Sequence, residues 1–194
     1  MNNSNGFLLV VSGPSGAGKG TICNALLEKY PEEYALSISV TSRAPRGMEV
    51  DGKEYFFKTL EEFEEMIRLD LLLEHARYVN NYYGTPRQWV EEKLQEGVNV
   101  ILEIDYQGGF QVSRKIPNVL MIFIMPPDLE ELKNRLVFRG TESEEQILKR
   151  LQKAEEEIKM AEQYDYIIIN EDVEKSVEML HNIVLHEKMK LTGE

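Results

Sequence analysis

Cysteine and basic residues are scarce in this 194-residue sequence. The single cysteine, Cys23, excludes an intrachain disulfide and a metal cage of several cysteines, and it is typical of a reducing compartment. With 22 Lys and Arg against 34 Asp and Glu, the net charge is −12. Sequence-independent binding to nucleic acid or to anionic lipid depends on basic side chains, so this balance argues against both.

Long apolar runs are also absent. The longest run, residues 119–125, is far below the ~18 residues that a membrane-spanning helix needs. The first residues lack the basic segment of a signal peptide. We therefore expect a cytoplasmic protein that binds neither nucleic acid nor membrane, and nothing in the sequence indicates an obligate protein partner.

Short apolar runs alternate with amphipathic stretches along the chain. We expect strands at residues 7–12, 35–40, 99–104, 119–125 and 166–169. We expect helices at residues 19–30, 60–69, 86–96, 128–138, 142–164 and 173–189. Continuous apolar runs favour a parallel sheet covered on both faces, and hence an α/β fold. Residues 42–83 break this rhythm and predict an inserted subdomain, with a short strand at 53–58.

The strongest motif is the glycine-rich stretch that joins the first expected strand to the first helix, SGPSGAGKGT at residues 12–21. Glycines let the backbone curl so that its N–H groups point at phosphate oxygens, and the helix N-terminus adds partial positive charge. Lys19 would reach the β- and γ-phosphates of a nucleotide. This strand–loop–helix context favours a phosphate-binding loop over an ordinary turn.

A second group of residues resembles an acceptor site. Arg43 and Arg46 stand in an extended, proline-containing stretch, and planar guanidinium groups suit two-point binding of phosphate. Tyrosine hydroxyls at positions 55, 82 and 83 add donors, and Glu74 with nearby hydroxyls suits the polar edge of a base. Each residue taken singly is equally consistent with a surface charge or a packing position.

Together these motifs resemble guanylate kinases, the bacterial form in particular. The matching stretches follow in order along nearly the whole chain: GPSGAGKGT, SVTSRAPRGMEVDGKEYFF, LLEHARYVNNYYGTP, LEIDYQG and ELKNRLVFRGTESEEQILKRL. The resemblance implies a P-loop nucleoside monophosphate kinase fold within one domain, residues 1–194. It implies a parallel-sheet core flanked by helices (residues 1–37, 87–128 and 160–194), an inserted GMP-binding subdomain (38–86) and a helical lid (129–159).

The resemblance also implies the reaction and its site. The γ-phosphoryl group of ATP, bound with Mg²⁺, is transferred to GMP, giving ADP and GDP for GMP recycling, and dGMP is left open as an acceptor. The implied ATP-binding residues are Gly13, Pro14, Ser15, Gly16, Ala17, Gly18, Lys19, Gly20 and Thr21. The implied GMP-binding residues are Ser39, Arg43, Arg46, Tyr55, Glu74, Tyr83, Gly84, Thr85, Glu103 and Asp105. The implied catalytic cations are Lys19, Arg135, Arg139 and Arg150.

Three positions depart from the family pattern. Ser or Thr usually follows the loop lysine, whereas here Gly20 does and Thr21 comes next, so the hydroxyl that contacts Mg²⁺ is displaced. Gly47 comes one position earlier than the glycine of the family pattern, so the backbone path of this loop is not predicted. Glu103 replaces the more usual Asp. We therefore assign no direct protein ligand to the metal, and Glu103, Asp105 and Thr21 remain candidates, acting through water.

Other classes of protein compete with this interpretation. A guanylate kinase-like module that binds phosphopeptides without catalysis typically has a degraded phosphate loop, whereas Lys19 and its glycines are present here. A kinase for another monophosphate, such as AMP, is opposed by Glu74 and by the arginine pair. A GTPase is opposed by the lack of an Asn-Lys-x-Asp motif. We expect an active guanylate kinase.

Overall fold

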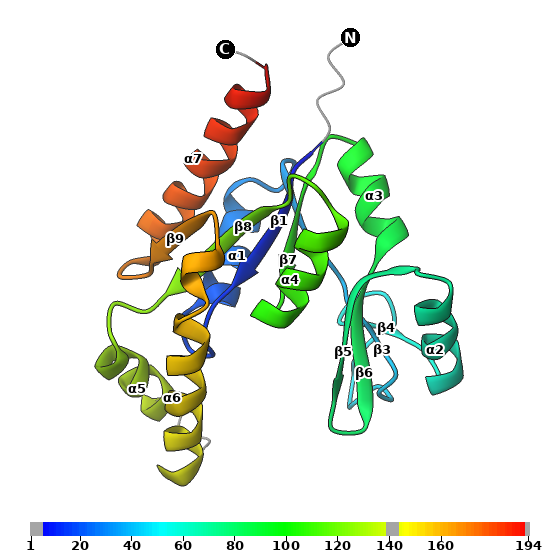
Figure 1. Cartoon of the computed structure of the whole chain (residues 1–194), viewed down its shortest axis with the longest axis horizontal. Helices are drawn as coiled ribbons and strands as arrows, with labels where there is room; N and C mark the ends of the chain where they lie inside the picture. The colour runs from blue at the N-terminus through cyan, green and yellow to red at the C-terminus, as the bar shows by residue number, and fades with distance from the viewer. Residues whose placement is uncertain (1–5, 139–143, 193–194) are drawn as a thin grey trace.

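The computed structural model describes residues 6–138 and 144–192, and its centre is a parallel sheet (Figure 1). The sheet is formed by β1 (Leu8–Ser12), β2 (Tyr34–Leu36), β7 (Asn99–Glu103), β8 (Leu120–Met125) and β9 (Tyr166–Ile169). The spatial order is β2-β7-β1-β8-β9, so β1 lies in the middle. The α/β fold with a parallel sheet, predicted from the sequence, is confirmed.

Helices cover both faces of this sheet. One face packs against α1 (Lys19–Lys29) and α7 (Val173–Thr192), and the other packs against α3 (Arg87–Gln95) and α4 (Tyr106–Lys115). Successive strand residues alternate between the two hydrophobic layers: Leu9 and Val11 belong to the first, and Leu8 and Val10 to the second. Because the central strands bury side chains in both layers, they appear in the sequence as continuous apolar runs.

A second, mixed sheet lies beside the first. It is formed by β3 (Val40–Thr41), β4 (Phe56–Phe57), β5 (Leu72–Tyr78) and β6 (Asn81–Pro86), in the spatial order β4-β3-β6-β5. Helix α2 (Leu60–Arg68) packs on it through Phe63, whose ring stacks on Tyr82 with 5.3 Å between centroids.

The second sheet and the helix pair α5 (Leu129–Phe138) and α6 (Glu144–Ile158) lie at the same end of the first sheet, on opposite sides (Figure 1). The strands of the first sheet terminate at this end, which is where open α/β sheets bind ligands. None of the helices within residues 6–138 and 144–192 is long and apolar enough to cross a lipid bilayer.

The strand predicted at residues 35–40 is wrong, because this run belongs to two sheets. Leu36 pairs with Ile101 in the first sheet, and the N–H of Ser37 still donates to the carbonyl of Ile101 at 2.9 Å. The chain then crosses over, and Val40 pairs with Phe56 in the second sheet. Both ends of the run are apolar, so periodicity does not reveal the change of sheet.

Other predicted boundaries also need correction. The helix predicted at 142–164 ends at Ile158, and a separate 3₁₀ turn, η1 (Ala161–Gln163), follows. Pro86 is the N-cap of α3 and not its first helical residue. The strand predicted at 53–58 is reduced to β4. Helix α4 and strands β5 and β6 were not predicted from the sequence. Helix α4 contains two adjacent glycines, and glycine disfavours helices.

Candidate active site

The glycine-rich loop runs from the end of β1 to the start of α1, as the sequence predicts. Two of its glycines are required by its shape. Gly13 has φ 143°, and a Cβ there would lie 2.1 Å from the carbonyl oxygen of Ile124. Gly18 has φ 95°, and a Cβ there would lie 2.3 Å from Nδ2 of Asn170. Any other residue at either position would strain the backbone and collide with a neighbour.

Lys19 is the first residue of α1, and its side chain folds back over the loop. Its Nζ donates to the carbonyl oxygens of Gly13 at 2.6 Å and Pro14 at 3.1 Å. The ammonium group therefore lies beside the helix N-terminus, whose free N–H groups add positive potential. This combination suits an anionic ligand such as phosphate.

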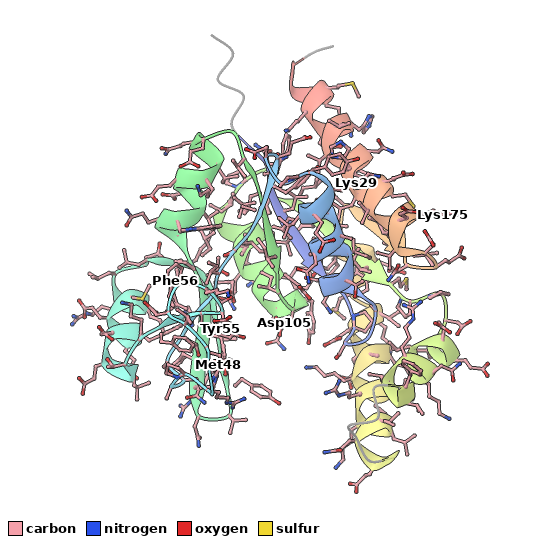
Figure 2. All side chains as sticks on the ribbon, turned by 180° about the vertical axis from the view of Figure 1, so that it is seen from behind. Lys29, Met48, Tyr55, Phe56, Asp105 and Lys175 are labelled. Carbon is pink, nitrogen blue, oxygen red and sulfur yellow. The ribbon has the colours of Figure 1, made fainter. Side chains whose placement is uncertain are left out.

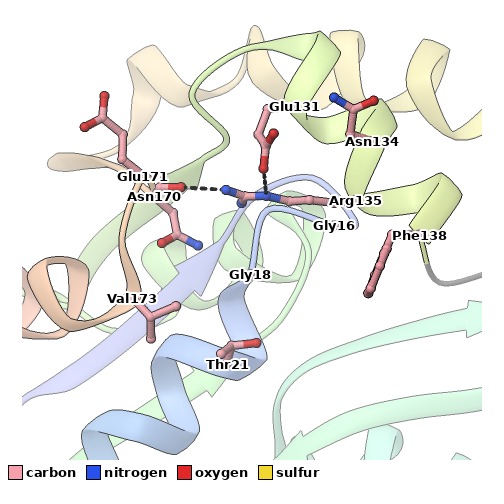
Figure 3. A pocket seen from close by; sticks show the side chains of 10 residues that line it. All are labelled: Gly16, Gly18, Thr21, Glu131, Asn134, Arg135, Phe138, Asn170, Glu171 and Val173. Carbon is pink, nitrogen blue, oxygen red and sulfur yellow. Dashed lines mark hydrogen bonds and ion pairs between the residues drawn. The ribbon is translucent and has the colours of Figure 1, made fainter.

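A cavity of about 550 Å³ opens beside the loop (Figure 3). It is lined by Gly16, Gly18, Thr21, Glu131, Asn134, Arg135, Phe138, Asn170, Glu171 and Val173. Sequence reasoning missed six of these residues as parts of a site: Glu131, Asn134, Phe138, Asn170, Glu171 and Val173. Asn170 and Glu171 carried a usable signal, because they are polar residues directly after a short apolar strand of the parallel sheet.

Asn170 fixes one wall of this cavity. It is 3% exposed, and its Nδ2 donates to the carbonyl of Ala17 at 2.8 Å while its Oδ1 accepts from Ser176 Oγ at 3.1 Å. The side chain thus holds the loop against α7. A buried amide satisfied on both sides is a rigid support for a binding site.

Arg135 projects from α5 toward the loop (Figure 3). Its Nε donates to Glu131 Oε1 at 2.8 Å, and its Nη2 donates to the carbonyl of Asn170 at 3.0 Å. The ion pair with Glu131 is the surface pair that its i,i+4 spacing allows. The second bond places the guanidinium against the wall of the cavity, so Arg135 is more than a surface charge.

Arg150, on α6, also reaches the loop. Its Nη1 donates to Oγ of Ser15 at 3.2 Å. The structure therefore brings Arg135 and Arg150, from two helices, to the glycine-rich loop. Arg139, the third arginine predicted for this cluster, lies outside the described residues.

Glu74 is a buried carboxylate of the second sheet, 6% exposed. Its Oε1 accepts from Oγ1 of Thr85 at 2.8 Å, and its Oε2 faces α4, where a Cβ on Gly108 would lie 3.0 Å away. Burial raises the pKa of the Glu74 carboxyl to about 7; the Thr85 hydrogen bond opposes this shift and the nearby charge of Asp105 adds to it. A buried acceptor-only group of this kind suits a ligand with adjacent N–H donors.

Arg43, two residues after β3, is buried, with 8% of its surface exposed. Its Nη1 and Nη2 donate to Oε2 and Oε1 of Glu49, each at 2.9 Å. The guanidinium lies 5.4 Å from the ring centroid of Tyr55 and 5.8 Å from that of Phe57. Glu49 also accepts from the N–H of Arg46 at 2.7 Å, so one carboxylate holds both predicted arginine positions. Sequence reasoning missed this role of Glu49.

The other predicted acceptor residues lie on the same sheet. The rings of Tyr55 and Tyr83 are 5.9 Å apart and nearly perpendicular. Gly84 is packed so closely that a Cβ would lie 2.7 Å from the carbonyl oxygen of Glu74. Ser39 is half-buried, and its backbone carbonyl accepts from Phe56 at 2.9 Å. The structure therefore gathers these residues around β3, β4 and β6. Arg46 is exposed and lies in the loop between β3 and β4.

Glu103 and Asp105 stand at the carboxyl end of β7, between the loop and the second sheet. A Cβ on Gly20 would lie 3.4 Å from Oε2 of Glu103, so this carboxylate borders the start of α1. Asp105 caps α4, its Oδ1 accepting from the N–H of Gly108 at 2.9 Å (Figure 2 labels its position). In the described residues, no group of three or more His, Cys, Asp or Glu side chains could hold a metal ion unaided.

Comparison with known proteins agrees with this arrangement. The family model for guanylate kinase matches residues 6–187. A guanylate kinase of Caldanaerobacter subterraneus is 53% identical over 186 residues, covering 96% of this chain and 90% of the relative. One of Oceanobacillus iheyensis is 50% identical over 190 residues, covering 98% and 92%. A crystal structure of guanylate kinase from Anaplasma phagocytophilum matches with a TM-score of 0.74 and 39% identity, covering 97% of this chain and 89% of that one. On these grounds, the chain belongs to the guanylate kinase family.

Proposed function

We propose that this protein transfers the γ-phosphoryl group of ATP to GMP, giving ADP and GDP. The observation that carries the proposal is the pairing of two sites at one end of the first sheet. One is the loop with Lys19 and two inward-reaching arginines, and the other is the second sheet with buried Glu74 and Arg43. Relatives at 50% identity and above, named guanylate kinases, support it.

On the donor side, the triphosphate of ATP would lie along residues 13–21, with Lys19 and the α1 N-terminus offsetting its charge. Its nucleoside would occupy the cavity beside Asn170 and Val173. Mg²⁺ bound to the phosphates would neutralise charge on the transferred group. Because the described side chains form no complete metal site, we propose that the ion is held mainly by phosphate and water, with Glu103, Asp105 and Thr21 nearby.

On the acceptor side, Arg43, Arg46, Tyr55 and Tyr83 would bind the GMP phosphate, and Glu74 would pair with the guanine N1–H and N2–H₂. Ser39 and Thr85 can add hydroxyl contacts to the base. Catalysis in such a site is positioning plus charge stabilisation. Residues 38–86 would act as the GMP-binding subdomain and residues 129–159 as a lid that brings its arginines over the transferred group and excludes water.

The test of this proposal is a coupled assay of ADP formation with a panel of nucleoside monophosphates. We expect rapid ADP formation with GMP and little with AMP, CMP or UMP. Equal use of AMP would contradict the acceptor assignment. No turnover with any monophosphate, together with tight binding of a phosphopeptide, would support the non-catalytic module considered in the sequence analysis.

Replacing Arg43 by methionine is expected to raise the KM for GMP by roughly 10- to 100-fold, with less than about a twofold change in the KM for ATP. Hydrogen bonds to charged groups contribute about 1.5–3 kcal/mol each, and only GMP would lose them. Because Arg43 is buried, exposed Arg46→Met serves as a second variant with less risk to folding. An equal loss of ATP affinity would show that the donor and acceptor sites are wrongly assigned.

Replacing Arg135 by methionine is expected to lower kcat on the order of 10³-fold, with a smaller change in either KM. Its charge should matter most as the phosphoryl group moves, in the manner of an arginine finger. Steady-state kinetics with both substrates varied will separate the two parameters. Lys133→Met on the same helix is the matched control. A change in KM alone would make Arg135 a binding residue.

A further inference from the structure

Strand β5, which carries Glu74, is irregular at that residue. It forms the edge of the second sheet and pairs with β6 alone among the described strands. Leu72 is opposite Pro86, whereas His75 is opposite Gly84. Two residues, Leu73 and Glu74, therefore face the single residue between Pro86 and Gly84. This is a β-bulge, a feature that redirects side chains.

The bulge explains why Glu74 faces α4. Leu72 packs in the core of the second sheet with Phe63, whereas Leu73 packs on the other side, in the cluster that includes Val112 of α4. In a regular strand Glu74 would share the side of Leu72, but its Oε2 faces Gly108 of α4. A shift of register by one residue would turn the side chains of this strand to the other face. The direction of the Glu74 carboxylate thus depends on the position of the bulge along β5.

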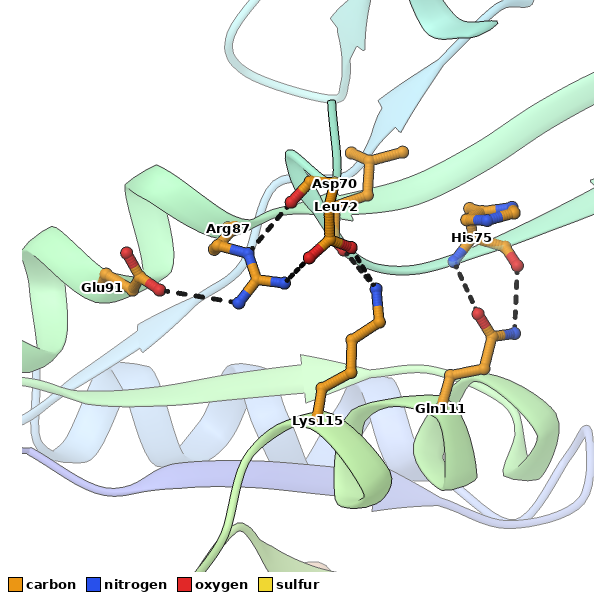
Figure 4. Close-up of polar contacts among 7 residues, drawn as sticks. All are labelled: Asp70, Leu72, His75, Arg87, Glu91, Gln111 and Lys115. Atoms are coloured by element: carbon orange, nitrogen blue, oxygen red, sulfur yellow. Dashed lines mark hydrogen bonds and ion pairs between the residues drawn. The ribbon is translucent and has the colours of Figure 1, made fainter. Parts of the chain in front are cut away.

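Gln111, on α4, holds the residue on one side of the bulge (Figure 4). Its Nε2 donates to the carbonyl of His75 at 3.0 Å, and its Oε1 accepts from the N–H of His75 at 3.2 Å. The carboxamide therefore pairs with the strand edge as a neighbouring strand residue would. His75 cannot leave its register without breaking both bonds.

Lys115, at the end of the same helix, holds the residue on the other side (Figure 4). Its Nζ donates to the carbonyl of Leu72 at 3.0 Å and to Oδ1 of Asp70 at 2.8 Å. Asp70 also accepts from Nη2 of Arg87 at 2.8 Å, which ties the start of β5 to α3. The bulge is thus held at both ends by side chains of the first sheet's helices.

Helix α4 is a firm support for these contacts. Gly108, Gln111 and Lys115 follow at spacings of three and four, so they share one face of the helix. The adjacent side of the helix packs on the first sheet, where Val112 is fully buried. A Cβ on Gly109 would lie 3.0 Å from Cγ1 of Val10, so the helix lies directly against β1.

We propose that Gln111 and Lys115 are positioning residues that hold the β5 bulge and thereby aim the Glu74 carboxylate at the base of the acceptor nucleotide. The proposal rests on the proposed function. Neither side chain needs to touch the nucleotide. Their effect is on base choice, because an acceptor-only carboxylate accepts from the N–H groups of guanine and finds none at N1 of adenine.

The test compares Gln111→Leu and Lys115→Met with two controls that remove the same residue types from exposed positions on α3, Gln88→Leu and Lys93→Met. We expect each test variant to lower kcat/KM for GMP about tenfold and to reduce the GMP:AMP ratio, since each loses two hydrogen bonds that hold the strand. The KM for ATP and the control variants should be unchanged. Lys115→Arg, which keeps the charge and a donor, should restore part of the ratio.

A double-mutant cycle separates positioning from general destabilisation. In a Glu74→Gln background, Gln111→Leu should have no further effect on the GMP:AMP ratio if it acts through Glu74. An undiminished effect in that background would overturn the proposal, as would an unchanged ratio in folded Gln111→Leu protein. If Gln111→Leu does not fold, the same cycle is measured with Gln111→Glu, which keeps an oxygen that accepts from the N–H of His75. Failure of the wild type to phosphorylate GMP would instead overturn the proposed function.

Discussion

Lys19→Met should lower kcat for GMP phosphorylation by about three orders of magnitude or more while the protein stays folded. The Lys19 ammonium lies 2.6 Å from the carbonyl of Gly13, at the point where the loop would surround the phosphates. Removing a preorganised charge from such a site costs about 10²–10³-fold for a single donor, and a full cation beside the transferred group should cost at least as much.

The matched control for this variant is Lys29→Met at the other end of α1 (Figure 2). Its ammonium forms an exposed ion pair with Glu178 at 3.3 Å, which contributes little to stability. Circular dichroism and thermal unfolding should be alike for both variants, and only Lys19→Met should lose turnover. If Lys19→Met turns over GMP at the wild-type rate, the loop does not act as a phosphate site.

The position of the glycine-rich loop could be predicted from the sequence, because the structure of this loop is local. Residues 13–18 form the loop between β1 and α1, and three glycines with positive φ make that loop recognisable in a single stretch of sequence. The first sheet was equally visible, because strands buried on both faces leave continuous apolar runs. Its one error, the run at 35–40, arose where two sheets share one uninterrupted stretch of chain.

The proposed acceptor side depends on contacts between residues that are distant in the chain, and the sequence alone did not reveal these contacts. In the sequence, Glu49 is only part of an irregular loop, although its carboxylate accepts hydrogen bonds from both Nη1 and Nη2 of Arg43. Gln111 lies 36 residues from His75 in the chain and has no motif of its own. A bulge such as the one at Glu74 is set by register and tertiary support, neither of which has a pattern in one sequence.

Glu74→Gln should lower kcat/KM for GMP roughly 100-fold and narrow the GMP:AMP ratio. A carboxylate accepts from the guanine N1–H and N2–H₂ together, whereas a carboxamide presents one acceptor and one donor, so a guanine N–H would face an amide N–H. Adenine has an acceptor at N1, and the carboxamide no longer rejects it. The measurement is kcat/KM for both nucleotides in both proteins. An unchanged ratio would make Glu74 a structural residue and shift attention to Glu103 or Asp105.

The pH dependence of GMP use should identify the same carboxylate. Burial raises the Glu74 pKa to about 7 in the free protein, and guanine pairs with the ionised form. The KM for GMP should therefore fall about tenfold between pH 6 and pH 8 in the wild type. The GMP phosphate also titrates in this range, and Glu74→Gln measures that effect alone. The tenfold fall in the wild type is expected in addition to any change in KM seen in Glu74→Gln.

The free energy of unfolding should decrease as the pH rises, whereas the binding of GMP improves. The folded-state pKa of Glu74 lies above the usual value of 4.5 for a glutamate, so the folded protein retains a proton that the unfolded chain releases. The contribution of Glu74 to the free energy of unfolding is thus complete below about pH 4.5 and is lost as the pH rises through 7. Glu74→Gln, which cannot ionise, should lack this loss and be no less stable than wild type at pH 8 in thermal unfolding. A carboxylate that weakens the free protein at the pH where it binds guanine is consistent with selection for recognition and not for stability, and equal pH profiles of unfolding in the two proteins would contradict this.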